Sequence, residues 1–336
     1  MSIATISAYA VKHRGGRAEP FSYERTLGDS DILVKITHCS VARGDVQFID
    51  DEWGDTRFPL VPGHELIGIV EAAGAAVTGL MVGDRVGVGY QQAACFSCEF
   101  CRSGREQLCP EQKVIGVHCP GGAAEHVGVD HRFAFKLPAA LDSAASAPLL
   151  SSGLTVCSAI TRAELPDRSE VAVLGVGGLG HLAIQFLRKL GHRVSAFSHS
   201  PEKKAAIEQL GAEYIDSAHL PGADARTKRF DFILSTVNAR FDVNAYLRML
   251  RPLGKLCFVA QPLEPLPVNV GLLYDAAQRT IYGHYVGSRS DMTAMLAFAA
   301  EHDIRSDVHL MPFTNVNEAI DRVRDRTIST KVVLQR

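Results

Sequence analysis

Four cysteines close together constrain this chain more than any other feature of its sequence. Cys95, Cys98, Cys101 and Cys109 form the pattern C-x₂-C-x₂-C-x₇-C and make up half of the chain's eight cysteines. Four thiolates at this spacing can close a tetrahedral shell around one Zn²⁺. Two disulfides or four unrelated thiols are the alternatives, and neither explains why these cysteines cluster in a polar loop. A shell of four protein ligands has no open position, so we expect a structural zinc in a loop at about residues 91–112 and the chemistry elsewhere.

The rest of the composition is that of an ordinary globular protein. The chain has 336 residues, enough for two domains that each bury a core. A net charge of −2 gives no electrostatic reason to expect a nucleic acid or an anionic membrane as partner. The N-terminus lacks the pattern of a signal peptide, and no apolar stretch has the length of a membrane span. We expect a cytoplasmic, reducing location, in which the four other cysteines need not pair: Cys39, Cys119, Cys157 and Cys257.

The pattern of apolar residues changes along the chain. Short segments rich in Val and Ile, separated by Gly and Pro, predict a β-barrel-like domain in residues 1–150, with strands at 6–13, 31–42, 66–74, 84–90, 124–130 and 133–138. In residues 151–287 strands alternate with helices, which indicates βαβ units and a parallel sheet: strands at 171–175, 192–198, 230–237, 255–261 and 280–286, helices at 181–190 and 201–210. Residues 288–336 predict two helices, at 290–302 and 315–326, and a closing strand at 331–335.

A glycine motif lies where the first strand of the parallel sheet should end. Gly175, Gly177 and Gly180 form G-x-G-x-x-G between a predicted strand and a predicted helix. These glycines permit a tight turn, close approach of the backbone to a pyrophosphate, and close packing of the helix on the strand. The helix N-terminus then offers N–H groups to the phosphates. A flexible glycine-rich turn is the alternative, but the strand–turn–helix context favours a dinucleotide site, to which we also assign Gly178, Leu179 and Thr236.

The next strand indicates which dinucleotide binds. An NAD site usually has Asp or Glu at this strand end to accept a hydrogen bond from the ribose 2′-OH. Here Ser198, His199 and Ser200 occupy the strand end, followed by Lys203. Hydroxyls and a cation can accommodate a 2′-phosphate, which a carboxylate would repel. We therefore predict NADPH, the alternative being that these residues are only a solvated strand end and helix start.

Together these segments resemble the medium-chain dehydrogenase/reductase superfamily and, within it, the cinnamyl-alcohol-dehydrogenase-like branch. The matching segments run nearly end to end: Pro62–Glu65, VGDRVGVG at 82–89, the cysteine loop, Ala147–Leu150, Gly175–Gly180 and FAAEH at 298–302. The resemblance implies an α/β protein with a GroES-like β-barrel catalytic domain and a Rossmann domain with a doubly wound parallel sheet. It also implies an active-site cleft between the domains, a small-molecule substrate, and a homodimer formed through the edge strand TIYGHYV.

Zinc-dependent members of the family hold a second, catalytic zinc, and here the resemblance fails. Their ligands come from the motifs C-H-T-D, G-H-E and P-L-L-C-A-G. In this chain Ala42 and Ser151 stand where the two thiolates should be, and only His64 and Glu65 match. A hydroxyl is a poor substitute for a thiolate, so we predict that the catalytic zinc is lost unless Cys39 or Cys157 replaces a ligand. The proton-relay Thr and the His that follows the motif are also replaced, by Gly44 and Gln47.

Several side chains are candidates for acid catalysis in such a pocket. We predict His64, Glu65 and Tyr90 as catalytic, because the family motif places the first two in the cleft. His118 and Tyr285 are further possible donors, although a surface loop and a packing role explain them equally well. Trp53 is a possible apolar wall, and Asp45 is expected to be structural, paired with an Arg.

Without a Lewis acid, hydride delivery favours an acceptor that is already electrophilic. The leading interpretation is therefore an NADPH-dependent reductase of an activated C=C or C=N bond: a conjugated enal or enone, or an iminium ion. The first alternative is a zinc-dependent alcohol dehydrogenase or aldehyde reductase with irregular zinc ligands. The second is a non-catalytic NADPH-binding protein.

Overall fold

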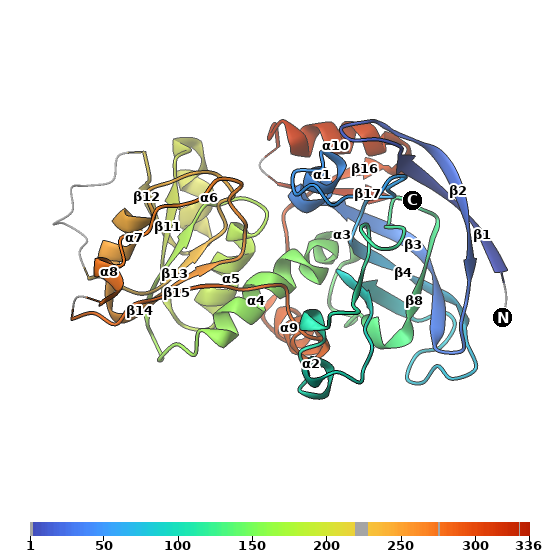
Figure 1. Ribbon diagram of the computed structural model, residues 1–336, viewed down its shortest axis with the longest axis horizontal. Helices are drawn as coiled ribbons and strands as arrows, with labels where there is room; N and C mark the ends of the chain where they lie inside the picture. The colour runs from blue at the N-terminus through green and yellow to red at the C-terminus, as the bar shows by residue number, and fades with distance from the viewer. Residues whose placement is uncertain (1–2, 219–227, 275, 329) are drawn as a thin grey trace. The chain divides into compact units, whose positions relative to one another are not determined.

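The computed structural model describes residues 3–218, 228–274, 276–328 and 330–336 of the chain (Figure 1). It divides into two compact units, one made of Met1–Leu154 and Gly287–Arg336 and the other of Thr155–Val286. The second unit is therefore inserted into the first. Helix α4 (Ser152–Arg162) begins in the first unit and continues into the second.

The first unit is built on strands whose side chains alternate between core and surface. Its main sheet has seven strands in the order β16-β17-β3-β4-β5-β9, with β8 also paired to β3, and β1 pairs with β2 in a separate ribbon. The strands are β1 (Ile3–Val11), β2 (Ala18–Thr26), β3 (Asp31–Val41), β4 (Glu65–Ala73), β5 (Arg85–Val88), β6 (Gln91–Ala93), β7 (Lys113–Val114), β8 (His126–Asp130), β9 (Ala134–Lys136), β16 (Val308–Pro312) and β17 (Lys331–Gln335). The helices are α1 (Arg43–Ile49), α2 (Glu99–Arg102), α3 (Ser143–Ser146), α9 (Arg289–His302) and α10 (Val316–Arg324).

The C-terminal strand β17 completes this sheet by pairing antiparallel with β3. Val332 lies opposite Val41, and on the other side of β3, Ser40 lies opposite Glu65 of β4. The start of β17 and the start of β4 therefore lie on either side of the C-terminal end of β3. This register brings together residues that are more than 260 positions apart in the sequence, and it builds the candidate site described below.

The second unit is a six-stranded parallel sheet in the order β12-β11-β10-β13-β14-β15. The chain winds outward from β10 in one direction and then from β13 in the other, so the crossover helices cover opposite faces. Its strands are β10 (Glu170–Leu174), β11 (Arg193–Ser198), β12 (Glu213–Asp216), β13 (Phe230–Ser235), β14 (Leu250–Phe258) and β15 (Thr280–Gly283), and its further helices are α5 (Gly180–Lys189), α6 (Lys204–Gln209), α7 (Val243–Met249) and α8 (Gly271–Tyr274). Phe197, Phe230 and Tyr246 form an aromatic cluster in its core.

This architecture confirms the predicted fold class, a GroES-like domain with a doubly wound Rossmann domain. Sequence patterns did not predict β2, whose outward residues are polar along its length, nor the short elements α1, β12, α7 and β16. Over the described residues no single helix combines the length and apolarity needed to cross a membrane. Only the segments Ser143–Leu150 and Ser152–Arg162 taken together, across a 53° bend, have that length and composition.

Candidate active site and metal site

The cysteine loop brings its four thiols to one point. The Sγ atoms of Cys95, Cys98, Cys101 and Cys109 all lie within 4.8 Å of one another. Two of the separations, Cys95 to Cys109 at 3.5 Å and Cys95 to Cys101 at 3.9 Å, are close to the edge of about 3.8 Å of a tetrahedron with Zn–S bonds of about 2.3 Å. These residues fit one Zn²⁺ with no open coordination position.

Backbone N–H groups around the loop stabilise a thiolate, the form of cysteine that binds a cation. The N–H groups of Ser97 and Cys98 donate to Cys95 Sγ, and hydrogen bonding from Ser97 lowers the pKa of Cys95 to about 6. Burial has the opposite effect deeper in the loop, where it raises the pKa of Cys101 to about 12 and also raises that of Cys109. Binding of a metal must therefore displace protons from the buried thiols, which makes its affinity depend on pH.

The loop is fixed to the rest of the first unit through an aromatic ring and a buried carboxylate. The guanidinium groups of Arg132 and Arg289 lie 3.5 Å and 5.1 Å from the ring centre of Phe96. Arg289 also donates to the buried Glu106 at 3.2 Å. The metal loop is thus held by α9 as well as by its own cysteines.

His64 is held by a carboxylate in a second, separate site of the same unit. Its Nδ1 lies 2.8 Å from Asp45 Oδ1, and both side chains are buried. Asp45 also accepts from the backbone N–H groups of Ala42 and Gly63, which fixes the carboxylate at the start of α1. The expectation that Asp45 pairs with an Arg was wrong, because its partner is His64.

The two charges of this pair support each other. Burial opposes the imidazolium form of His64, but the Asp45 carboxylate outweighs burial and the pKa of His64 is raised. Burial likewise opposes the Asp45 carboxylate, but His64 and the two backbone N–H groups outweigh it and the pKa of Asp45 is lowered. Because Nδ1 is engaged with Asp45, Nε2 is the nitrogen that remains to meet a substrate.

Glu65 is engaged in a second buried pair. Lys331 Nζ donates to Glu65 Oε2 at 2.9 Å, and both the backbone N–H and the hydroxyl of Ser152 donate to Oε1, at 2.9 Å and 2.6 Å. Lys331 also donates to Ser152 Oγ at 3.1 Å. Both carboxylate oxygens of Glu65 therefore have strong partners within the protein.

The residues around His64 do not fit a catalytic metal. Ala42 and Ser151 supply no thiolate, and among the described residues the only group of three or more His, Cys, Asp or Glu side chains that could hold a metal ion is the cysteine cluster of the loop. Cys39 is not a substitute, since it completes no such group among the described residues and its buried thiol donates to the carbonyl of Ser40. Nor is Gln47 free to replace the missing relay His, because its amide donates to Glu52.

Gly44, which replaces the relay Thr, leaves space beside His64. A Cβ added at Gly44 would lie 3.3 Å from Cε1 and 3.8 Å from Nε2 of His64, and no closer atom would meet it. The absence of a side chain at Gly44 avoids crowding of the Cε1–Nε2 edge of the imidazole.

The other predicted donors are placed less centrally. The ring of Tyr90 stands edge-on to His64, with 5.6 Å between ring centres, so it shapes the wall of this site. His118 is exposed and its Nδ1 accepts from the backbone N–H of Val114, a role in its own loop. Trp53 packs against Phe48. Tyr285 belongs to the second unit and is 43% exposed.

The glycine motif of the second unit has the geometry of a phosphate-binding turn. Gly175 has φ of +86°, and a Cβ there would lie 2.7 Å from Val237 Cγ2 and 3.0 Å from Thr236 Oγ1. Gly177 has open space where its Cβ would be, which leaves the backbone accessible to a pyrophosphate. Thr236 Oγ1 donates to the Gly175 carbonyl at 2.9 Å and so fixes the turn, and α5 begins at Gly180 just after Leu179.

The residues predicted to select the cofactor lie together at the end of β11. Ser198 is buried, and its hydroxyl accepts from the backbone N–H of Ser200 at 3.2 Å. His199 is exposed. Lys203 lies across the glycine turn and donates to the carbonyl of Val176 at 2.9 Å. The Lys203 ammonium thus lies at the glycine turn, and residues 198–200 at the end of β11 include no acid.

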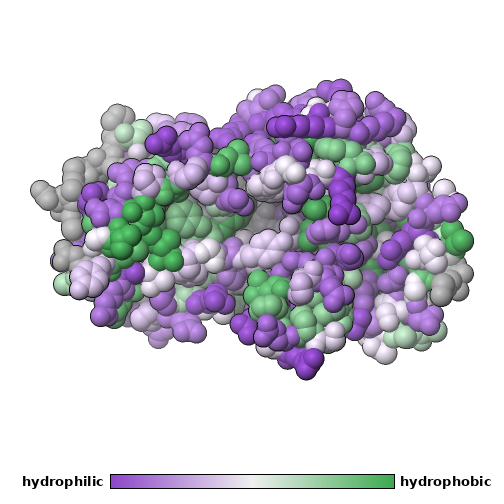
Figure 2. All heavy atoms as spheres, viewed as in Figure 1, coloured by the Kyte–Doolittle hydropathy of each residue, from purple (hydrophilic) through white to green (hydrophobic). Residues whose placement is uncertain are grey.

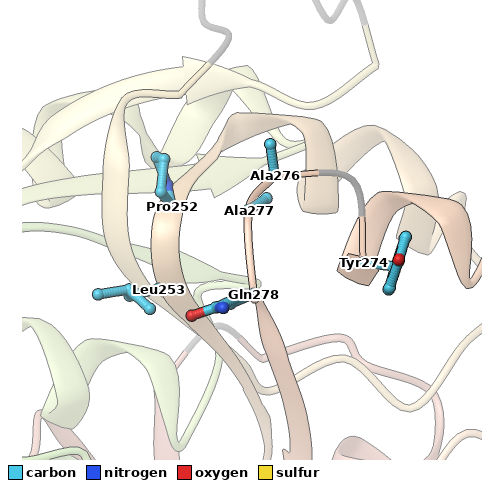
Figure 3. A pocket seen from close by; sticks show the side chains of 6 residues that line it. All are labelled: Pro252, Leu253, Tyr274, Ala276, Ala277 and Gln278. Atoms are coloured by element: carbon cyan, nitrogen blue, oxygen red, sulfur yellow. The ribbon is translucent and has the colours of Figure 1, made fainter.

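An open pocket of about 500 Å³ in the second unit is not part of this site. It is lined by Pro252, Leu253, Tyr274, Ala276, Ala277 and Gln278 (Figure 3). These residues lie at the amino-terminal ends of β14 and β15, whereas nucleotides bind beyond the carboxyl ends of parallel strands.

Two family models match the chain: an alcohol dehydrogenase GroES-like domain over residues 28–139 and a zinc-binding dehydrogenase over residues 178–301. The chain is 39% identical over 333 residues to an aldehyde reductase of Synechocystis, which covers 98% of both chains. The chain belongs to the medium-chain dehydrogenase/reductase superfamily, in its cinnamyl-alcohol-dehydrogenase-like branch. It is an oxidoreductase. It is also 37% identical to a probable formaldehyde dehydrogenase of Bacillus subtilis, over 97% of this chain and 96% of the relative. A cinnamyl alcohol dehydrogenase of Sorghum bicolor has the same fold, with a TM-score of 0.94 at 32% identity over 99% of this chain and 98% of that one.

These relatives favour the first alternative from sequence, a zinc-dependent alcohol dehydrogenase or aldehyde reductase with irregular zinc ligands, over the leading interpretation. Sequence reasoning also missed Lys331 and Ser152, which hold Glu65. A lone Lys at the start of an apolar strand is a weak signal, and nothing in the sequence pairs it with a residue of β4.

Proposed function

We propose that this protein reduces an aldehyde to an alcohol, or runs the reverse reaction, with hydride carried by NADPH. The observation that carries the proposal is the oriented Asp45–His64 pair in a chain that matches an aldehyde reductase over nearly its whole length. The glycine turn of the second unit is able to bind the pyrophosphate of the dinucleotide. The substrate is a small molecule.

Residues of the first unit can donate the proton that must reach the carbonyl oxygen when the hydride reaches the carbonyl carbon. The cofactor, when bound, donates a hydride to the carbonyl carbon. His64, in its imidazolium form, donates the Nε2 proton to the carbonyl oxygen and is reprotonated from solvent after the alcohol leaves. Asp45 orients the ring and stabilises its charge, Tyr90 limits access of water, and Glu65 acts indirectly through its charge.

NADPH is the proposed cofactor, because Ser198, Ser200 and Lys203 form a polar and cationic strand end. A charge-assisted contact to the 2′-phosphate is worth roughly 1.5–3 kcal/mol. Lys203→Ala should therefore weaken NADPH binding by about tenfold or more and leave NADH binding little changed, as measured by titration of nicotinamide fluorescence. Tighter binding of NADH than of NADPH to the unaltered protein contradicts this assignment.

A second candidate, reduction of an activated C=C or C=N bond, is favoured by one observation. Ala42 and Ser151 remove the thiolates with which the family's zinc is held, and a conjugated or cationic acceptor needs less polarisation than a simple aldehyde. His64 would then protonate the carbon or oxygen atom on which negative charge develops after hydride transfer.

We also propose a homodimer in which β15 of one chain pairs with β15 of another. Among the described strands β15 pairs only with β14, so its other edge has no strand partner there. Large apolar side chains are exposed in and just before α8, as Figure 2 shows for this end of the second unit: Leu263, Val268, Val270 and Tyr274. Light scattering at micromolar concentration should give twice the mass of 36.3 kDa, and a monomer mass contradicts the dimer.

One substrate panel tests these assignments together. Benzaldehyde, cinnamaldehyde, a cyclic enone and a cyclic iminium ion are each incubated with NADPH, and the products are identified by mass and NMR. Formation of alcohols from the first two supports the aldehyde reductase, whereas saturation of the C=C bond or reduction of the iminium ion alone supports the second candidate. Tight NADPH binding with no turnover of any substrate overturns both and indicates a non-catalytic NADPH-binding protein.

A further inference from the structure

We propose that the pocket around His64 works without a metal ion, because it lacks both thiolate ligands and its remaining carboxylate, Glu65, is engaged by Lys331 and Ser152. The absence of a metal ion beside His64 holds whichever substrate is reduced. It separates this chain from the zinc-binding dehydrogenases whose family model it matches.

Charge balance is the first reason. In zinc-dependent relatives the two missing ligands are thiolates, whose charges sum to −2 and cancel the +2 of the ion. Loss of the ion together with both thiolates therefore leaves the net charge of the pocket unchanged. Retention of Zn²⁺ beside Ala42 and Ser151 would instead add two uncompensated positive charges to a buried site that already contains Lys331.

The engagement of Glu65 is the second reason. Glu65 is fully buried, and its two oxygens accept from the Lys331 ammonium and from two donors of Ser152. A metal could take Glu65 only by breaking this buried ion pair and leaving Lys331 without its carboxylate. The penalty for an uncompensated buried charge is large, so the pair disfavours recruitment of Glu65 as a ligand.

The third reason is that His64 would stand alone. With Glu65 engaged and both thiolates absent, one imidazole nitrogen is the only ligand left, whereas a catalytic zinc needs about three protein ligands. The imidazole already has the carboxylate partner that orients it, and the groups that face it are Asp45, Glu65, Lys331 and the ring of Tyr90. This arrangement suits proton donation by Nε2.

Cobalt(II) replacement tests the inference by spectroscopy, without any assay of activity. Protein is unfolded, stripped of metal and refolded with excess Co²⁺, unbound ion is removed, and the bound cobalt is counted and its visible absorption recorded. We expect one cobalt per chain with the absorption of a tetrahedral tetrathiolate site, and an unchanged spectrum in His64→Ala. The double variant Ala42→Cys/Ser151→Cys restores the thiolates, and its count should rise to two.

A second cobalt in the unaltered protein that disappears in His64→Ala would overturn the proposal. A count of one in the double variant as well would show that the thiolates are not what the pocket lacks, and would overturn the charge-balance explanation. Circular dichroism of each variant after refolding identifies one that has not folded. Ser151→Cys alone then provides the folded comparison, with an expected count of one.

Discussion

The cysteine loop and the His64 pocket differ in where their residues come from. The loop takes all four thiols from residues 95–109, fixed by local turns and hydrogen bonds. The pocket collects side chains from α1, β4, α4 and β17, and its hydrogen-bonded partners Glu65 and Lys331 are 266 positions apart. In the local site, substitution of any one cysteine removes a ligand from the closed shell and so affects the whole site. In the dispersed site, single residues can be substituted one at a time, provided that each substitution leaves the buried charges paired.

Removal of one loop cysteine should have the largest effect. Cys109→Ser takes a thiolate from the closed shell, and structural zinc sites contribute on the order of 10 kcal/mol to the folding of small zinc domains. We expect loss of the bound zinc and a fall of at least several kcal/mol in the free energy of unfolding, measured by denaturant titration with metal analysis. Cys157→Ser, outside the cluster, is the control and should keep its zinc. Equal free energies of unfolding for Cys109→Ser and Cys157→Ser would contradict a structural role for the zinc loop.

Lys331→Met comes next, because it leaves the Glu65 carboxylate buried without a cation. Removal of one partner of a buried pair costs about 3–5 kcal/mol in unfolding free energy. Lys136→Met is the matched control: its pair with Asp84 is exposed on the lysine side and worth less than about 1 kcal/mol. The double variant Glu65→Gln/Lys331→Met should recover much of the loss. A Lys331→Met protein as stable as Lys136→Met would show that the pocket does not depend on this pair.

Asp45→Asn should change activity more than stability. The amide keeps the shape but removes the charge that raises the pKa of His64. A raised pKa keeps the imidazolium present at higher pH, so reduction should decline as pH rises through that value. In Asp45→Asn the decline should move to lower pH, and the rate should fall by about 10²–10⁴. A pH–rate profile identical to that of the unaltered protein would exclude His64 as the proton donor.

The sequence alone predicted the local features of this molecule and not its long-range pairs. The cysteine spacing, the glycine turn and the apolar strands each depend on residues close in sequence, so the predictions for them needed no knowledge of the fold. The Asp45–His64 and Glu65–Lys331 pairs depend on the order β17-β3-β4, which no local pattern reveals. The substitutions Ala42, Gly44 and Ser151 could be identified from motif comparison, but the engagement of Glu65 by Lys331 and Ser152 required the structure.

The zinc content of the native protein tests the central claim most directly. Protein purified without added metal is analysed by mass spectrometry for zinc per chain, beside Cys109→Ser treated in the same way. We predict one zinc in the unaltered chain and none in the variant, because among the residues that the structure describes only the loop has a full set of ligands. Two zincs in the unaltered chain, with one retained in Cys109→Ser, would contradict this prediction and place a metal beside His64.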